Sequence, residues 1–169
     1  NTLDNFVTEN QYSPEIIFAI PYDREEGTQG NYLASLTFHY NHWQTISSSV
    51  SNWTWAVNGI CAQPGVYSSF EEGDKRIACM AQGPQLRPNG DPVLDRNGDE
   101  LVYTEEIADY YDATEGAGCR LQKYEVIFGE YPERDYDLVL MRYAEILMMK
   151  AECYVRLGNP EAAYPLVSQ

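Results

Sequence analysis

The chain has 169 residues, which suffices for one domain with a hydrophobic core but not for two domains of ordinary size. Hydrophobic residues make up 44% of the sequence, and this content argues against disorder along the whole chain. The 26 acidic and 11 basic residues give a formal net charge of −15. This balance argues against partners such as nucleic acid or anionic lipid, which need clustered Lys and Arg. An acidic surface is compatible with an uncharged partner, although solubility alone would also explain it.

Tyrosine and tryptophan are frequent in polar surroundings. The sequence holds 14 Tyr and 3 Trp, many of them in the first half and among residues typical of loops. Both side chains combine a flat apolar face with a polar group. Their frequency in loops therefore indicates a recognition surface.

No stretch approaches the roughly 20 consecutive apolar residues that cross a bilayer as a helix. The chain starts Asn1-Thr2-Leu3, without a basic segment or an apolar signal segment. We therefore expect it to be part of a longer chain. The four cysteines lack CxxC spacing, which disfavours zinc and thioredoxin-like chemistry, and we expect no cofactor. A disulfide between Cys61 and Cys79 stays open, and Cys153 is expected to be buried.

The first predicted element is a short strand. Residues 15–20 form an apolar run rich in β-branched residues that Pro21 ends, so we expect a buried strand there. From residue 23 to 85 glycine, serine and aromatic residues alternate without a lasting period. This pattern predicts loops with short helical turns.

Residues 91–104 predict a β-hairpin. Two apolar segments, 92–94 and 101–103, flank Asp95-Arg96-Asn97-Gly98-Asp99, and Asn-Gly supplies the positive φ that such turns prefer. Residues 105–137 are acidic, tyrosine-rich loop sequence, with one extended candidate at 120–128.

A helix is predicted from Leu138 to Leu157. Apolar or small residues recur at three- and four-residue spacing, which predicts one buried stripe at positions 140, 143, 144, 147, 151, 154 and 155. Glu152 and Arg156 form an i,i+4 pair off this stripe, and Gly158 suits the position after a helix C-terminus.

A second helix should follow at once. Asn159 and Pro160 are typical of an N-cap and a first helical residue, and Pro165 should kink or shorten the helix. Two helices joined by so tight a turn pack antiparallel, as in one tetratricopeptide-like unit. We predict a mainly α fold, with an irregular lobe of short strands and a hairpin at 1–137 and this helix pair at 138–169. One such unit cannot bury its own stripe, so further helices are expected outside the chain.

Four segments in order resemble the SusD/RagB family. Residues 137–152, DLVLMRYAEILMMKAE, closely resemble its hxxhRYAEhLLMxAEAhxxxG signature. Residues 13–20, SPEIIFAI, are similar to its SEIIFAI segment. Residues 70–76, FEEGDKR, resemble its DxR element, and residues 118–124, GCRLQKY, resemble its GxRLxKY segment.

The resemblance implies a cell-surface protein of Bacteroidetes, lipid-anchored on the outer membrane for polysaccharide utilisation. Such proteins have tetratricopeptide-like helix pairs supporting an irregular ligand-binding lobe. They cap a TonB-dependent SusC-type barrel, bind carbohydrate and take part in nutrient uptake, and one branch handles peptides. The resemblance therefore implies a non-catalytic subunit that passes oligosaccharides to the barrel. A peptide-binding lid and a tetratricopeptide-type scaffold that binds only protein stay open as alternatives.

The residue types themselves mark a candidate glycan site. Sugars need flat aromatic faces together with side chains that pair with hydroxyls. In an extended segment Trp53 and Trp55 would share one face. The alternative is that these indoles cover a core. The full candidate set is Trp43, Asn52, Trp53, Trp55, Asn58 and Tyr67.

Other charged residues are given structural roles. We interpret Asp74 and Arg76, in the DxR element, as an ion pair or turn stabiliser. The helix signature contains Arg142, Glu145 and Glu152, which we expect to hold the helix pair to its neighbours.

The sequence gives little support for a metal site or a catalytic site. His39 and His42 are spaced i,i+3 but lack a third ligand. Calcium-loop spacing is only partly met, because glycine comes at position 4 instead of 6. The residues at these calcium-loop positions are Asp95, Asn97, Asp99 and Glu106. No nucleophile-elbow, phosphate-loop or dinucleotide motif is present, so we do not expect an enzyme.

Overall fold

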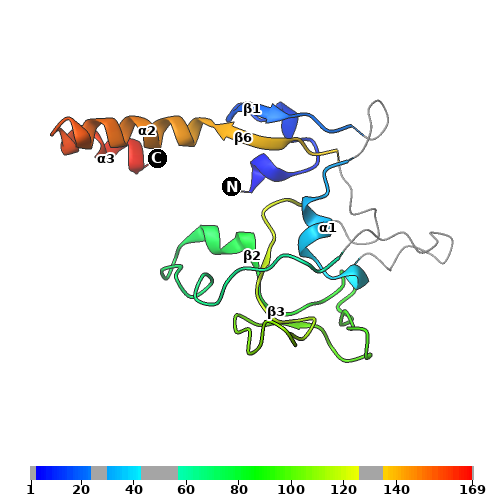
Figure 1. Ribbon diagram of the computed structural model, residues 1–169. Helices are drawn as coiled ribbons and strands as arrows, with labels where there is room; N and C mark the ends of the chain where they lie inside the picture. Colours follow the sequence, from blue (N-terminus) through cyan, green and yellow to red (C-terminus); the bar gives the residue numbers. More distant parts are fainter. Residues whose placement is uncertain (1–2, 24–29, 43–56, 126–134, 169) are drawn as a thin grey trace.

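The computed structural model describes residues 3–23, 30–42, 57–125 and 135–168. Strands β1 (Ile16–Ile20) and β6 (Leu138–Arg142) lie in one layer with helix α2 (Tyr143–Arg156), and an irregular lobe lies beneath this layer (Figure 1). The remaining helices and strands are α1 (Leu33–Thr37), α3 (Tyr164–Val167), β2 (Met80–Ala81), β3 (Gly83–Pro84), β4 (Val102–Tyr103) and β5 (Arg120–Leu121). The 3-10 helices are η1 (Asp4–Phe6), η2 (Asn10–Tyr12), η3 (Tyr40–His42), η4 (Lys75–Cys79) and η5 (Pro160–Ala162).

Helices, short strands and a loop-rich lobe are confirmed. Most described residues lie in turns and irregular segments, and regular helix is concentrated in α2. Among the described residues helix exceeds strand, as expected, but irregular segments exceed both. The reason is that backbone hydrogen bonds in the lobe join distant turns instead of neighbouring helical residues.

The prediction of one helix from residue 138 is wrong at its start. Residues 138–142 form β6, which pairs antiparallel with β1 from Ile20↔Leu138 to Ile16↔Arg142. The strand leads directly into α2, where the Tyr143 amide donates to the Glu15 carbonyl at 2.8 Å. A short apolar run fits either a strand or a helix. Pairing with β1, more than 100 residues away in sequence, decides for the strand.

The predicted burial of β1 is also wrong for the described residues. The strand forms where expected, but Phe18 is 59% exposed and Ile17 is more than half exposed. A two-stranded sheet has two faces, and the described residues cover them incompletely.

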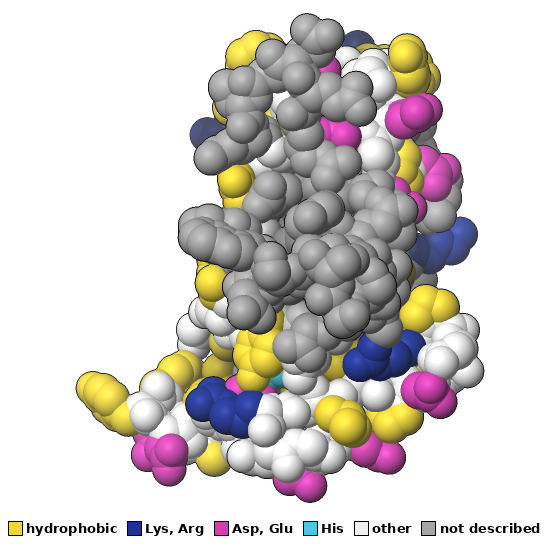
Figure 2. Space-filling model, turned by 90° about the vertical axis from the view of Figure 1, so that its right-hand side faces the viewer, with side chains coloured by type: hydrophobic (Ala, Val, Ile, Leu, Met, Phe, Trp, Pro, Cys, Tyr) yellow, Lys and Arg dark blue, Asp and Glu magenta, His cyan; other side chains and the backbone are white. Residues whose placement is uncertain are grey.

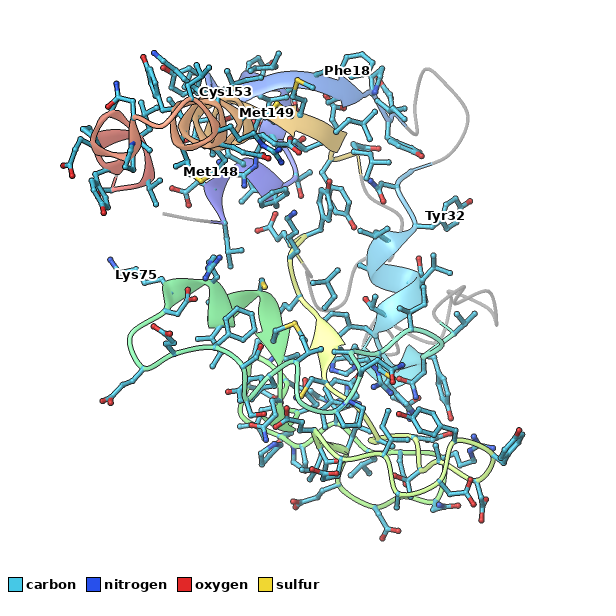
Figure 3. The ribbon with its side chains drawn as sticks, turned by 60° about the vertical axis from the view of Figure 1, so that its left-hand side comes forward. Phe18, Tyr32, Lys75, Met148, Met149 and Cys153 are labelled. Atoms are coloured by element: carbon cyan, nitrogen blue, oxygen red, sulfur yellow. The ribbon has the colours of Figure 1, made fainter. Side chains whose placement is uncertain are left out.

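Helix α2 likewise exposes most of its predicted stripe. Ala151 is the one residue of α2 that is buried within the described ranges, whereas Tyr143 and Val155 are more than half exposed. Cys153 is exposed, contrary to expectation, and Figure 3 shows it on α2 near Met148 and Met149. The physical reason is that, among the described residues, α2 packs mainly against the short elements η5 and α3 and the end of β6. Within the described ranges, no helix combines the length and apolar character needed to cross a membrane.

The end of α2 confirms the prediction for Gly158. Its φ is +76°, its amide donates to the Val155 carbonyl at 3.0 Å, and the Asn159 amide donates to the Tyr154 carbonyl at 2.9 Å. This pair of hydrogen bonds is the Schellman arrangement, which favours glycine at the left-handed position. The second helix is split into η5 and α3, with Pro165 in the first turn of α3, where its missing N–H costs little.

The hairpin is present, but its pairing extends beyond the prediction. Leu94 and Glu100 face each other across a turn in which Gly98 takes φ +88°. Beyond this turn the strand β4 pairs with β3 and not with residues 92–94. The Val93 amide donates to the Gln85 carbonyl at 2.8 Å, so a third segment joins the hairpin.

The buried hydrophobic residues form two clusters. The first, here called the lobe core, is Ala34, Phe38, Ala81, Val93, Leu101 and Tyr103. The second, here called the strand core, is Phe6, Tyr124 and Tyr136. Helix α1 connects the two clusters, because Ala34 belongs to the lobe core and Leu33 packs against the strand core.

Removing the Tyr103 hydroxyl should destabilise the lobe. This buried hydroxyl accepts the backbone N–H of His39 at 3.0 Å, and Tyr103→Phe would leave that amide without an acceptor. We expect the free energy of unfolding to fall by about 1–3 kcal/mol in chemical denaturation. Tyr111→Phe, at a fully exposed position, is the matched control and should leave the denaturation midpoint unchanged. Equal midpoints for both variants would contradict the role of this hydrogen bond.

Candidate functional site

A cavity of about 390 Å³, here called the lobe pocket, lies in the irregular lobe. It is formed where η3 meets residues 57–61, the hairpin turn and residues 107–120. Figure 2 shows acidic, basic and apolar side chains intermixed on the surface of the lobe. The side chains in the lining with aromatic or polar groups are Tyr40, Asn58, Arg96, Tyr110, Thr114, Glu115 and Arg120.

Arg120 forms the inner wall of the lobe pocket. It is 2% exposed, and its guanidinium lies over the Tyr103 ring, 4.7 Å from the centroid. Its Nε and Nη2 donate to Asn58 Oδ1 at 3.1 and 2.9 Å. Nη1 and Nη2 also donate to backbone carbonyls within residues 115–118. The guanidinium thereby joins residue 58 to the loop before β5 and gives the pocket a fixed wall.

Asn58 owes its conformation to the same contacts. Its φ is +51°, in the left-handed region that asparagine tolerates better than most residues. Its Nδ2 donates to the Glu115 carbonyl at 2.8 Å, and its Oδ1 accepts from the Arg120 guanidinium. Both ends of the amide are therefore used within the protein.

Glu115 connects three segments around the pocket. Its Oε2 accepts from His39 Nε2 at 2.8 Å and from the Arg96 amide at 2.9 Å. Its Oε1 accepts from the Tyr40 hydroxyl at 3.1 Å and from Arg96 Nε. Burial raises the pKa of Glu115, but these hydrogen bonds outweigh burial and lower the pKa to about 2. The carboxylate is therefore ionised at every physiological pH.

Two tyrosines present ring surface at the pocket. Tyr40 stacks at a tilt on His39, with ring centroids 4.0 Å apart. Burial, followed by the hydrogen bond to Glu115, raises the pKa of Tyr40, so its hydroxyl stays protonated. Tyr110 is 63% exposed, and its hydroxyl donates to Gln63 Oε1 at 2.9 Å. Each ring is thus held through its hydroxyl; His39 covers one face of Tyr40, and the more exposed Tyr110 offers the larger ring surface to a ligand.

The predicted glycan-binding residues fall into two groups. Trp43, Asn52, Trp53 and Trp55 lie outside the described residues. Asn58 lines the lobe pocket, whereas Tyr67 is half-buried in a neighbouring turn and does not line it. That turn is held by Glu105, whose Oε1 accepts the amides of Gly65 and Ser68, each at 2.9 Å.

Asp74 and Arg76 pair at the start of η4. The Asp74 carboxylate accepts the Arg76 amide at 2.9 Å and the guanidinium Nη2 at 2.6 Å. The pair lies on the surface, with the arginine side chain 72% exposed. The hydrogen bond from Arg76 lowers the pKa of Asp74.

The helix-signature residues lie at the start of α2 and along it. Arg142 Nη1 is 3.6 Å from Glu15 Oε2, and its guanidinium lies 5.1 Å from the Phe6 ring centroid. Glu145 lines a second cavity of about 350 Å³ beside Arg142 and Phe6. Glu152 accepts from Arg156 Nε at 2.7 Å in the predicted i,i+4 pair.

The calcium positions do not converge on an ion site. Asp95 Oδ1 accepts the amides of Asn97 at 2.8 Å and Asp99 at 3.0 Å, so this carboxylate stabilises the hairpin turn. Glu106 is joined to the turn by no described contact. Among the described residues, no group of three or more His, Cys, Asp or Glu side chains has metal-binding geometry.

The remaining alternatives from the sequence concern histidine and cysteine. His39 and His42 are buried and hydrogen-bonded within the lobe. His42 stacks on the Tyr103 ring, which is the environment of a core residue. Cys61 and Cys79 are free thiols, so the structure does not contain the disulfide between them.

Sequence reasoning missed most of the lobe pocket. Tyr40, Arg96, Tyr110 and Glu115 come from separate stretches of polar loop, and no spacing joins them. Arg120 could have been singled out, because it is the arginine of the GCRLQKY segment that resembles the family pattern.

Comparisons with known proteins agree on one family. Residues 111–169 match the SusD family. The chain is 27% identical over 177 aligned residues to SusD-like protein P38 of Formosa agariphila, covering 98% of this chain and 31% of that protein. The predicted resemblance to the SusD/RagB family is confirmed.

The fold of a solved SusD superfamily protein agrees with this result. The crystal structure of a SusD superfamily protein from Parabacteroides distasonis superposes with a TM-score of 0.58 at 16% identity. The superposition covers 96% of this chain and 30% of that chain. This SusD-like chain therefore spans less than a third of the length of each of these two relatives.

Replacing Arg120 should unfold the lobe at lower denaturant concentration. Arg120→Met would leave Asn58 Oδ1 and several buried carbonyl oxygens without donors. We expect the free energy of unfolding to fall by at least about 3 kcal/mol. Arg76→Met is the control, since that arginine lies on the surface. A denaturation midpoint that is equally unaffected in both variants would contradict the proposed role of Arg120.

His42 should make stability depend on pH. Burial lowers the pKa of His42 from 6.5 to about 4, whereas the unfolded chain keeps the ordinary value. Between these values the unfolded state binds the proton more strongly, so stability is full above pH 6.5 and declines as pH falls towards 4. The loss should approach about 3 kcal/mol.

Thermal melts at pH 7, 6 and 5 measure this loss. His42→Phe keeps an aromatic ring beside Tyr103 but cannot titrate, and its melts should depend less on pH across this range. A pH dependence as steep as that of the parent protein would rule His42 out as the titrating group.

Proposed function

We propose that this chain is the ligand-binding part of a non-catalytic cell-surface protein. On this proposal the protein captures oligosaccharides and delivers them to a TonB-dependent SusC-type transporter. An N-terminal lipid anchor would hold it on the outer membrane. Support comes from the SusD likeness over nearly the whole chain, because SusD-family proteins are in general non-catalytic and work with SusC-type transporters.

We also propose that the ligand-binding lobe lies within residues 1–137, and that the helix pair predicted for 138–169 is tetratricopeptide-like from Tyr143 onward, after β6. Contact of α2 with η5 and α3 supports the pair. Exposed apolar residues such as Met149 and Val155 on α2 offer surface that further helices would cover. Arg142, Glu145 and Glu152 would then help to hold this pair in place.

The composition of the lobe pocket carries the glycan proposal. A sugar presents C–H groups on its faces and hydroxyls around its rim, so it needs ring faces and polar groups together. The pocket offers the rings of Tyr40 and Tyr110 beside Thr114, Arg96 and Glu115. Its volume of about 390 Å³ suits one or two sugar rings.

The predicted tryptophans would extend this site. Val57 and Asn58 line the lobe pocket, and Trp53 and Trp55 precede them by only a few residues. We propose that Trp43, Trp53 and Trp55 add an aromatic surface for neighbouring sugar rings, and that Asn52 adds an amide that pairs with hydroxyls. Tyr67 would lie at the edge of the site, and Asn58 would form part of the pocket wall.

The state of Glu115 argues against catalysis in the pocket. A glycosidase needs a carboxylic acid with a raised pKa and a second carboxylate at a set distance. Glu115 has the opposite property, because hydrogen bonds lower its pKa to about 2 and occupy both of its oxygens. It is suited to positioning neighbouring groups and not to moving protons.

Calorimetry of the intact protein against a panel of oligosaccharides tests the proposal. We expect at least one to bind, and Tyr110→Ala to weaken it about 3- to 10-fold by removing a stacking surface. Tyr111→Ala is the matched control, since Tyr111 is its neighbour but does not line the pocket. Tryptophan fluorescence should be quenched by the same sugar, and less so in Trp53→Ala or Trp55→Ala.

Other outcomes would replace the proposal. Binding of mixed peptides with indifference to every sugar would indicate a peptide-binding lid. Binding of neither, together with co-purification of a barrel or another protein, would indicate a scaffold. Equal losses of sugar affinity in Tyr110→Ala and Tyr111→Ala would place the site away from the lobe pocket.

A further inference from the structure

The lobe pocket is basic within an acidic chain. The charged residues in its lining are Arg96, Glu115 and Arg120, two cations against one carboxylate. The whole chain carries a formal charge of −15. A local excess of positive charge therefore runs against the composition of the protein, and it lies where the aromatic rings are.

Arg96 is held so that its terminal nitrogens remain open. Its backbone amide and its Nε both donate to Glu115, and within the described part of the chain these are its hydrogen bonds. The side chain is 70% exposed. Because Glu115 engages Nε, the outer edge formed by Nη1 and Nη2 remains available as the fork that suits a carboxylate or a sulfate.

Arg120 adds charge without adding donors. Its acceptors are the amide oxygen of Asn58 and backbone carbonyls within residues 115–118, all of them uncharged. Among the described residues, no carboxylate pairs with this buried guanidinium, since Glu115 approaches it only through its carbonyl. Its positive charge is therefore poorly screened and acts on the interior of the pocket.

Acids near the pocket reduce this excess, but Glu115 is the one carboxylate among the lining residues that the structure describes. Asp95 is the neighbour of Arg96 in the hairpin turn, but its carboxylate accepts the amides of Asn97 and Asp99 and does not line the pocket. Glu115 forms an ion pair with Arg96 and also accepts from His39 and Tyr40, so Arg120 is the cation of the lining that no described carboxylate pairs.

We infer that the lobe pocket binds a sugar residue that carries an anionic substituent, either the carboxylate of a uronic acid or a sulfate ester. The inference rests on the proposed glycan-binding function and names the class of glycan. Nη1 and Nη2 of Arg96 pair with the anion, and Glu115 positions that guanidinium. The ring of Tyr110 packs against the sugar, and the buried charge of Arg120 favours the anion over a neutral group.

Matched pairs of oligosaccharides test this inference on the intact protein. Each pair shares one backbone: an oligogalacturonate and its methyl ester, and sulfated oligosaccharides with their desulfated forms. In calorimetry at pH 7 we expect the charged member of at least one pair to bind at least about tenfold tighter than the neutral member. The uronate and sulfate arms distinguish the two sources of negative charge.

Two variants locate the preference. Arg96→Gln should lower the ratio of charged to neutral affinity several-fold, with the remainder due to the charge of Arg120, while the neutral sugar still binds. Arg76→Gln, at an exposed arginine outside the pocket, should keep the full ratio. Unchanged thermal melts for both variants establish that neither effect reflects unfolding.

The outcomes separate this inference from the proposed function. Neutral sugars that bind as tightly as charged ones, with dependence on Tyr110, would overturn the inference and leave the glycan-binding function in place. A charge preference that survives undiminished in Arg96→Gln would also overturn it. Binding of no sugar by the parent protein would overturn the proposed function and the inference together.

Discussion

The irregular lobe depends on the buried guanidinium of Arg120. Long loops contain many backbone groups that no helix or sheet satisfies, and burying them without partners is costly. Arg120 offers five donors in a rigid plane, and they reach the side chain of Asn58 and carbonyls within residues 115–118. Its other face lies on Tyr103 in the lobe core. One side chain thereby fixes the loop that carries Glu115 and ties it to the only described core of the lobe.

The Glu115 carboxylate positions side chains that line the lobe pocket. Its backbone is held by Arg120 and Asn58, and its carboxylate holds Tyr40 and Arg96. Groups from three distant segments are thereby oriented before any ligand arrives. Such preorganisation reduces the ordering that binding would otherwise require. The same contacts lower the pKa of Glu115 and keep it ionised, so positioning and charge come from one set of hydrogen bonds.

The net charge of the chain and the charge of the lobe-pocket lining have opposite signs. A formal charge of −15 favours an uncharged partner when the chain is considered as a whole. The lining of the lobe pocket has the opposite excess, because it contains Arg96 and Arg120 but only one carboxylate, that of Glu115. At close range a few oriented groups outweigh a screened surface field. Composition is therefore a poor guide to the chemistry of this site.

By itself the sequence determined the local elements: the strand at 16–20, the helix that ends before Gly158, the turn at Gly98 and the resemblance to SusD proteins. These depend on neighbouring residues and on motifs, which a single chain displays. Tertiary structure alone decided that residues 138–142 form a strand, because their partner β1 is more than 100 residues away. It alone brought Tyr40, Arg96 and Glu115 together, since side-chain hydrogen bonds across 19 to 76 residues have no period or spacing in the sequence.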